Sequence, residues 1–136
     1  MTVIDDRIKE LLKMNPRGRP NDSFNCHGAS MYVLGVVPKL KYIDFPEMIK
    51  TLSKLKKGFH GLKATQIDWD KNTRGDLVVI GEHDHSGIIT TPSSTNPIVF
   101  SKHGRLYCAR ERLKKLVDFY SRYCGANGRA SVYRVK

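Results

Sequence analysis

The fold class is decided by residues 75–91, which read Gly75-Asp76-Leu77-Val78-Val79-Ile80-Gly81-Glu82-His83-Asp84-His85-Ser86-Gly87-Ile88-Ile89-Thr90-Thr91. Two β-branched runs, residues 75–81 and 86–91, are separated by four polar residues, which predicts two short strands joined by a tight connection. Residues 97–101 predict a third strand and residues 131–135 a fourth. The short connections between the first three strands indicate an antiparallel meander.

Helical periodicity dominates the rest of the chain. Apolar residues at helical spacing predict helices over residues 4–14, from near Asn25 to near Pro38, and from Phe45 to Gly58, where Phe45, Ile49, Leu52 and Leu55 form the apolar stripe. The longest helix is expected over residues 108–124. The expected order is three helices, then three strands, then the helix over residues 108–124 and the last strand. Helices and strands segregated along the chain in this way predict an α+β fold. The 136 residues fit one domain, residues 1–136.

The chain is strongly basic, with 24 Lys+Arg against 13 Asp+Glu and a formal net charge of +11. The bases concentrate in residues 39–63 and 102–136, on either side of a net acidic segment at 66–85. This distribution favours a polyanionic partner such as nucleic acid, anionic lipid or an acidic cell-wall polymer. A zinc finger, an RNA-recognition signature and a basic recognition helix are not found in the sequence.

Three further features restrict the class of protein. No apolar run approaches the roughly 18 residues of a membrane span. Acids rather than bases follow Met1, and no apolar segment comes next, so we expect a cytoplasmic protein or one exported without a cleaved signal peptide, delivered by a phage or a secretion system. The three cysteines are too few and too widely spaced for a disulfide framework.

Cys26 is the candidate nucleophile. It follows Asn25, a residue suited to capping, and therefore lies in the first turn of the second helix, where free backbone N–H groups are expected to lower its pKa. His85 opens the second strand and is the candidate general base, since a thiol nucleophile needs an imidazole within hydrogen-bond reach. Without further motifs, Cys26 also fits a small buried core residue.

Three motifs together resemble the NlpC-type branch of the papain-like cysteine peptidases. They are Asn25-Cys26-His27-Gly28-Ala29-Ser30 at a helix start, Gly75-Asp76-Leu77-Val78-Val79-Ile80 and His85-Ser86-Gly87-Ile88-Ile89, in the order the family has them. The resemblance covers residues 24 to about 104. It implies a papain-like fold, in which N-terminal helices pack on an antiparallel sheet, and hydrolysis of peptide bonds, often those of bacterial peptidoglycan.

The resemblance also assigns roles. Cys26 becomes the nucleophile and His85 the general base and acid. The polar residue that orients the imidazole falls in Val99-Phe100-Ser101-Lys102-His103, where alignment on the strand favours Ser101 and chemistry favours His103. The backbone N–H of Cys26 is the natural oxyanion donor, with the Asn25 side chain or the His27 N–H as helpers. The same machinery supports transamidation, deamidation and acyl transfer.

The remaining histidines and cysteines have structural interpretations. His83 is the rival base but is expected in an exposed loop, and His27 projects away from the Cys26 thiol. Cys108 and Cys124 are expected in the core. We expect no metal site, because paired ligand spacings such as Cys-x-x-Cys are lacking, and no cofactor. Expected partners are a peptide or peptidoglycan-like substrate and an immunity or inhibitor protein. The alternative is a small basic binding module without catalysis.

Overall fold

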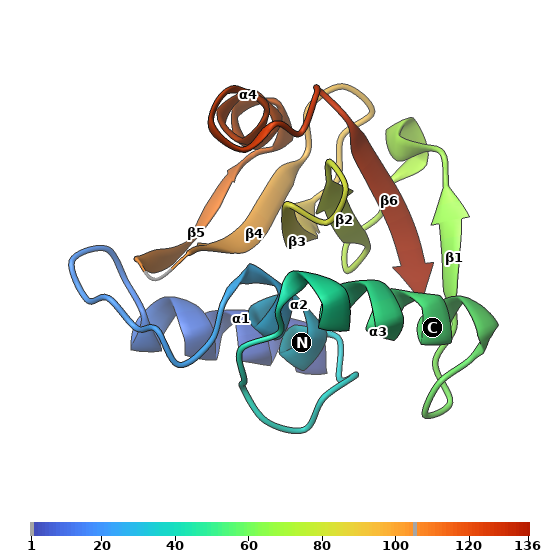
Figure 1. Cartoon of the computed structure of the whole chain (residues 1–136), viewed down its shortest axis with the longest axis horizontal. Helices are drawn as coiled ribbons and strands as arrows, with labels where there is room; N and C mark the ends of the chain where they lie inside the picture. The colour runs from blue at the N-terminus through green and yellow to red at the C-terminus, as the bar shows by residue number, and fades with distance from the viewer. Residues whose placement is uncertain (1, 105) are drawn as a thin grey trace.

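The protein is an α+β structure in which helices cover both faces of one antiparallel sheet (Figure 1). The computed structural model describes residues 2–104 and 106–136. Their helices are α1 (Val3–Met14), α2 (Cys26–Val33), α3 (Phe45–Lys57), α4 (Leu113–Cys124) and the short 3₁₀ helix η1 (Trp69–Lys71). Their strands are β1 (Ala64–Ile67), β2 (Leu77–Ile80), β3 (His85–Thr91), β4 (Ile98–His103), β5 (Tyr107–Arg112) and β6 (Ala130–Val135).

The six strands are antiparallel in the order β1-β6-β2-β3-β4-β5. The predicted meander of β2, β3 and β4 is confirmed, with Leu77 paired to Ile88 and Ile88 to Phe100. The C-terminal strand β6 inserts between β1 and β2. Arg134 of β6 also donates hydrogen bonds of 3.1 and 3.0 Å to Asp76, the residue before β2.

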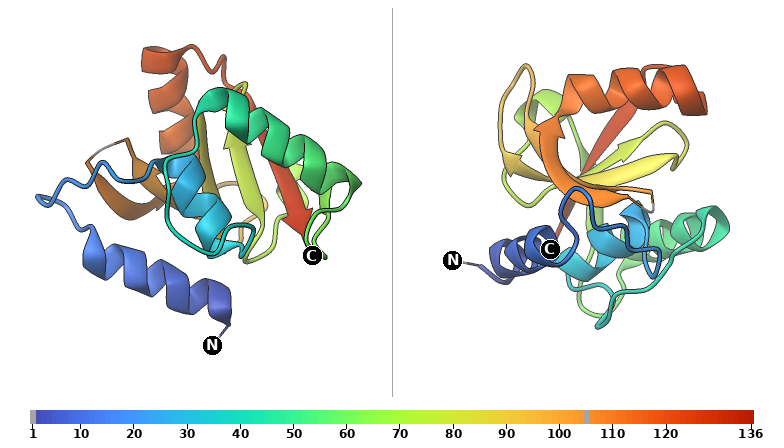
Figure 2. Two further views of the ribbon diagram at one scale, coloured as in Figure 1. Left: turned by 60° about the horizontal axis from the view of Figure 1, so that its bottom comes forward. Right: turned by 90° about the vertical axis from the view of Figure 1, so that its left-hand side faces the viewer.

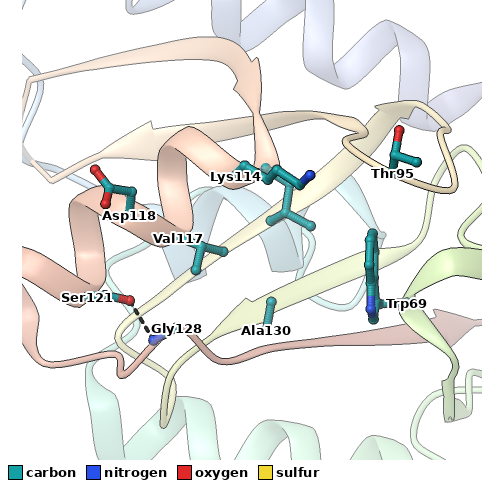
Figure 3. A pocket seen from close by; sticks show the side chains of 9 residues that line it. Trp69, Thr95, Lys114, Val117, Asp118, Ser121, Gly128 and Ala130 are labelled. Carbon is teal, nitrogen blue, oxygen red and sulfur yellow. Dashed lines mark hydrogen bonds between the residues drawn. The ribbon is translucent and has the colours of Figure 1, made fainter.

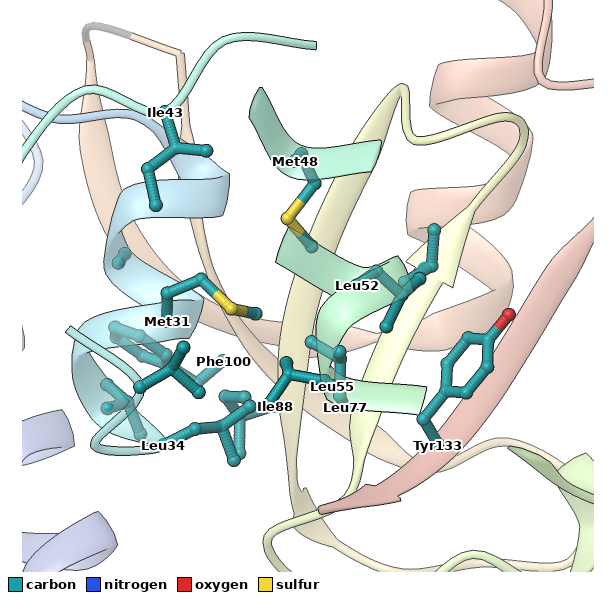
Figure 4. Close-up of a cluster of buried hydrophobic side chains, with 14 of the residues drawn as sticks. Met31, Leu34, Ile43, Met48, Leu52, Leu55, Leu77, Ile88, Phe100 and Tyr133 are labelled. Carbon is teal, nitrogen blue, oxygen red and sulfur yellow. The ribbon is translucent and has the colours of Figure 1, made fainter. Parts of the chain in front are cut away.

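Two hydrophobic clusters fill the spaces on either side of the sheet, and Figure 2 shows α1, α2 and α3 on one face with α4 on the other. The larger cluster joins α1–α3 to the sheet through residues such as Met31, Leu52 and Phe100 (Figure 4). The smaller cluster packs α4 on the opposite face through Leu113, Leu116 and Tyr120. Burial of these apolar side chains is the main force that fixes both layers.

Two predicted helices are shorter in the structure than the sequence indicates. The second helix ends at Val33 rather than near Pro38, because Gly35 adopts φ 79° and donates to the Tyr32 carbonyl. The helix predicted over 108–124 begins only at Leu113, since residues 107–112 pair with β4 as strand β5. Strand β1 was not predicted. On α3, Phe45 and Ile49 are exposed and Met48 is buried. The buried face of the helix therefore contains Met48 in place of the predicted Phe45 and Ile49.

Candidate functional site

Cys26 is the first residue of α2, and the preceding Asn25 caps the helix. The Asn25 amide oxygen accepts hydrogen bonds from the backbone N–H of Gly28 and of Ile43, both at 3.0 Å, and its amide nitrogen donates to the Ile43 carbonyl at 2.6 Å. A Cβ on Gly28 would lie 1.8 Å from the Lys41 carbonyl oxygen, so only glycine fits there. These contacts tie the helix start to residues 41–43 and fix the position of the thiol.

His85 is the first residue of β3, and its imidazole is almost fully buried. The ring stacks on Tyr120 of α4, with centroids 4.0 Å apart and an interplanar angle of 16°. Its Nε2 makes no hydrogen bond to the residues that the structure describes. Cys26 and His85 line one cavity of about 360 Å³ together with Asn25 and Tyr120. The structure therefore brings the predicted nucleophile and base to one cavity.

His103 lies next to His85, on the neighbouring strand. Continuing the register of Ile88 with Phe100 places these two histidines opposite each other, and their rings stack with centroids 5.7 Å apart. The contact is a stack rather than the hydrogen bond expected of an orienting residue. Ser101, the other predicted orienting residue, is buried, and its hydroxyl has no hydrogen-bond partner in residues 2–104 and 106–136. Proximity to the ring of His85 favours His103.

Two contributors to this site were not predicted from the sequence. Glu111 of β5 places Oε1 3.3 Å from Nε2 of His103, at ion-pair distance, while its side chain is only 11% exposed. Tyr120 of α4 supplies the ring on which His85 stacks. Neither role has a local sequence signal, because each depends on an element that follows the motifs and crosses back over the site.

His27 has a structural role, as expected for a poor base. Its Nε2 lies 2.7 Å from the His83 carbonyl, which only accepts, so Nε2 carries the hydrogen. Its Nδ1 lies 2.8 Å from the Ser86 hydroxyl, which in turn lies 3.1 Å from the Ser30 hydroxyl. This chain of hydrogen bonds holds α2 on β3 and leaves no ring nitrogen of His27 to accept a proton from Cys26.

Burial sets the protonation states of the site. It raises the pKa of the Cys26 thiol to about 11, although hydrogen bonds from Ser86 and from the backbone of His27 and Cys26 act in the opposite direction. Burial also lowers the pKa of His85 well below its ordinary value, and His103 and His27 add repulsion. The predicted lowering of the thiol pKa is therefore wrong, because loss of hydration outweighs the N–H groups of the first turn. At neutral pH the site holds a thiol and a neutral imidazole.

This protonation state predicts slow alkylation of Cys26. A pKa of about 11, against about 8.5 for a free thiol, lowers the thiolate fraction at pH 7 by about 300-fold, while the greater nucleophilicity of the more basic thiolate recovers roughly tenfold. Iodoacetamide should therefore modify Cys26 roughly 20 to 30 times more slowly than free cysteine, and the exposed Cys124 should react first. Peptide mass spectrometry from pH 6 to 11 measures both rates. A plateau for Cys26 below pH 8.5 would instead establish a thiolate–imidazolium pair.

The remaining candidates lie as follows. His83 is in the turn between β2 and β3, as expected, but it is half-buried and also lines the cavity. Cys108 is buried on β5, as predicted, with burial raising its pKa to about 11. The prediction that Cys124 lies in the core is wrong, because the last turn of α4 leaves it exposed at the rim of the same cavity.

A separate cavity of about 480 Å³ lies between η1, α4 and β6, beside Trp69 and Val117 (Figure 3). The residues described around it include neither cysteine nor histidine, so it offers no cysteine–imidazole pair. In residues 2–104 and 106–136, no three His, Cys, Asp or Glu side chains are grouped to hold a metal ion. No helix of this part of the chain is long and apolar enough to cross a membrane.

Comparison of the chain with protein-family models, with curated proteins and with solved structures gives no match.

Proposed function

We propose that this protein is a cysteine hydrolase of papain-like fold that cleaves amide bonds through Cys26 and His85. The observation that carries the proposal is that the first residue of α2 and the first residue of β3 line one cavity. A buried imidazole nitrogen without a hydrogen bond to the described protein residues costs stability, and such groups are typical of functional sites. The order of the three motifs resembling NlpC-type peptidases supports the same conclusion.

The proposed chemistry starts from the neutral Cys26 thiol and the neutral His85 imidazole. As the Cys26 sulfur attacks the carbonyl carbon of an amide, His85 accepts the thiol proton. The new oxyanion receives hydrogen bonds from the backbone N–H of Cys26 and of His27, since the Asn25 cap already engages the N–H of Gly28. His85 then protonates the leaving amine, and the C–N bond breaks to give a thioester on Cys26. Water, deprotonated by His85, hydrolyses the thioester and restores the thiol.

Asn25 acts mainly through the backbone in this scheme. Its amide oxygen and nitrogen hold Gly28 and Ile43, which keeps the N–H groups of the first turn directed at the site. Tyr120 holds the imidazole by stacking, and His103, whose Nε2 lies 3.3 Å from Glu111, supports it from the neighbouring strand. Peptidoglycan stem peptides and protein segments are the two substrate classes proposed, with delivery of the protein as an exported enzyme or effector.

The binding-module alternative has weaker support. The helical cations of the two basic segments, residues 39–63 and 102–136, lie on helices that cover opposite faces of the sheet (Figure 2). They are Lys50, Lys54, Lys56 and Lys57 on α3, and Lys114, Lys115 and Arg122 on α4. A single backbone-tracking groove of the kind that binds nucleic acid requires cations on one continuous surface.

The test is cleavage of defined amides by the wild-type protein and by Cys26→Ala. Purified peptidoglycan stem peptides and a mixture of denatured protein peptides serve as substrates, and mass spectrometry detects the new amine and carboxylate ends. We expect cleavage by the wild type and by Cys124→Ala, which removes a thiol from the cavity rim, and at least a 10³-fold loss in Cys26→Ala. Equal cleavage by the wild type and Cys26→Ala would refute the proposal.

A further inference from the structure

Two cavities adjoin at the candidate site. The first, of about 360 Å³, holds Cys26 and His85, and the second, of about 680 Å³, is lined by His103 and Glu111. Gly104 and Tyr120 belong to the lining of both. A substrate whose scissile bond lies at Cys26 therefore has room to extend past Tyr120 into the second cavity.

Large apolar side chains are concentrated at these cavities. Of the nine that are exposed in residues 2–104 and 106–136, five line one of the two. Tyr42 (58% exposed) and Phe45 (44%) border the first, and Leu106 (58%), Phe119 (47%) and Tyr123 (69%) border the second. Exposed apolar side chains are ordinary when scattered, but a group around a concave site marks a binding surface.

The exposed rings also contact the site. Phe119 packs edge-on against Tyr120, the ring that stacks on His85, with centroids 5.1 Å apart, and Tyr123 follows at 4.9 Å from Phe119. On the other side, Phe45 meets His83 edge-on at 5.9 Å. An aromatic surface thus continues outward from the catalytic pair in both directions.

Charged groups in the second cavity define the kind of apolar substrate. Arg17 lies 3.7 Å from Glu111 and over the ring of Tyr107, and Arg122 lies 3.4 Å from Asp118. A hydrocarbon chain laid over these groups would remove their water and give them no hydrogen bonds. A peptide backbone supplies N–H and C=O groups at every residue while its side chains cover the rings.

We propose that the substrate is a polypeptide segment with large apolar side chains on both sides of the scissile amide. This inference rests on the proposed amide hydrolysis at Cys26. One flanking side chain packs on Tyr42 and Phe45, and the other on Leu106, Phe119 and Tyr123. Small and polar stem peptides leave both aromatic surfaces uncovered and are poor substrates.

The test uses four internally quenched peptides of equal length. Their central amide is flanked by Phe and Leu on both sides, on the N-terminal side, on the C-terminal side, or by Ser and Gly throughout. We expect kcat/KM to rise at least tenfold with each apolar side. Phe119→Ala and Phe45→Ala should each remove the preference on one side, whereas Ile49→Ala, exposed on α3 but outside both cavities, should leave both preferences unchanged.

Two additional substrates make the outcome decisive. Faster cleavage of an N-myristoyl glycine amide than of the doubly apolar peptide would overturn the proposal in favour of a lipid-derived substrate. Equal rates on all four peptides, or cleavage of peptidoglycan stem peptides alone, would also overturn it. Cysteine-dependent cleavage in any of these cases leaves the proposed hydrolase function standing, while loss of Cys26 dependence removes both.

Discussion

Replacing His85 with alanine should lower amide turnover by about 10²–10⁴-fold, the range for removal of a general base. The reason is that Cys26 is a neutral thiol at neutral pH. A thiol whose pKa burial raises to about 11 cannot attack until another group accepts its proton. His27 cannot replace His85, since both of its ring nitrogens are engaged with Ser86 and the His83 carbonyl. The measurement is kcat/KM on a peptide that the wild type cleaves.

The matched control is His83→Ala, which removes another imidazole from the lining of the same cavity. It should retain turnover within about threefold, since a group outside the reaction contributes little to transition-state stabilisation. The same assay separates the two predicted orienting residues. His103→Ala should lower turnover more than Ser101→Ala does. The His103 ring stacks on His85, while the Ser101 hydroxyl lacks a hydrogen-bond partner in the described part of the chain. Full loss in His83→Ala with an active His85→Ala would reverse the assignment.

The sequence predicts the elements whose signals are local. Apolar spacing indicates α1 and α3, and the β-branched runs indicate β2 and β3. Residues 107–112 contain Ala, Arg and Glu, which favour helix, yet their pairing with β4 makes them a strand. The register with a distant strand has no signature in the segment itself, and the four residues of β1 were missed for the same reason.

The residues of the candidate site likewise divide into those with a local sequence signal and those without one. Asn25, Cys26 and His85 stand in short motifs at element starts, so their convergence could be anticipated. Glu111 and Tyr120 reach the site only after β5 and α4 return to it, so no motif marks them. The direction of the Cys26 pKa shift was missed because a helix start is local, whereas burial depends on how β3 and α4 close around the thiol.

Acid should destabilise the folded protein below about pH 6.5, the ordinary pKa of histidine. Burial lowers the pKa of His27 to about 4 in the folded protein, and the pKa values of His85 and His103 are also lowered. Between the folded and unfolded pKa values the unfolded chain binds more protons, so the free energy of unfolding falls as pH decreases through this window. The shift of His27 alone corresponds to a loss of about 3 kcal/mol by pH 4.

Urea unfolding at half-unit steps from pH 7 to 4.5 measures this slope. His27→Gln should make it shallower by up to one proton, even where the substitution lowers stability at every pH by breaking the hydrogen bonds to Ser86 and the His83 carbonyl. A slope that His27→Gln leaves unchanged would mean that His27 binds its proton equally in the folded and unfolded chain. The Ser30–Ser86–His27 chain would then have to accommodate an imidazolium, with the Ser86 hydroxyl turned to accept from Nδ1 and donate to Ser30.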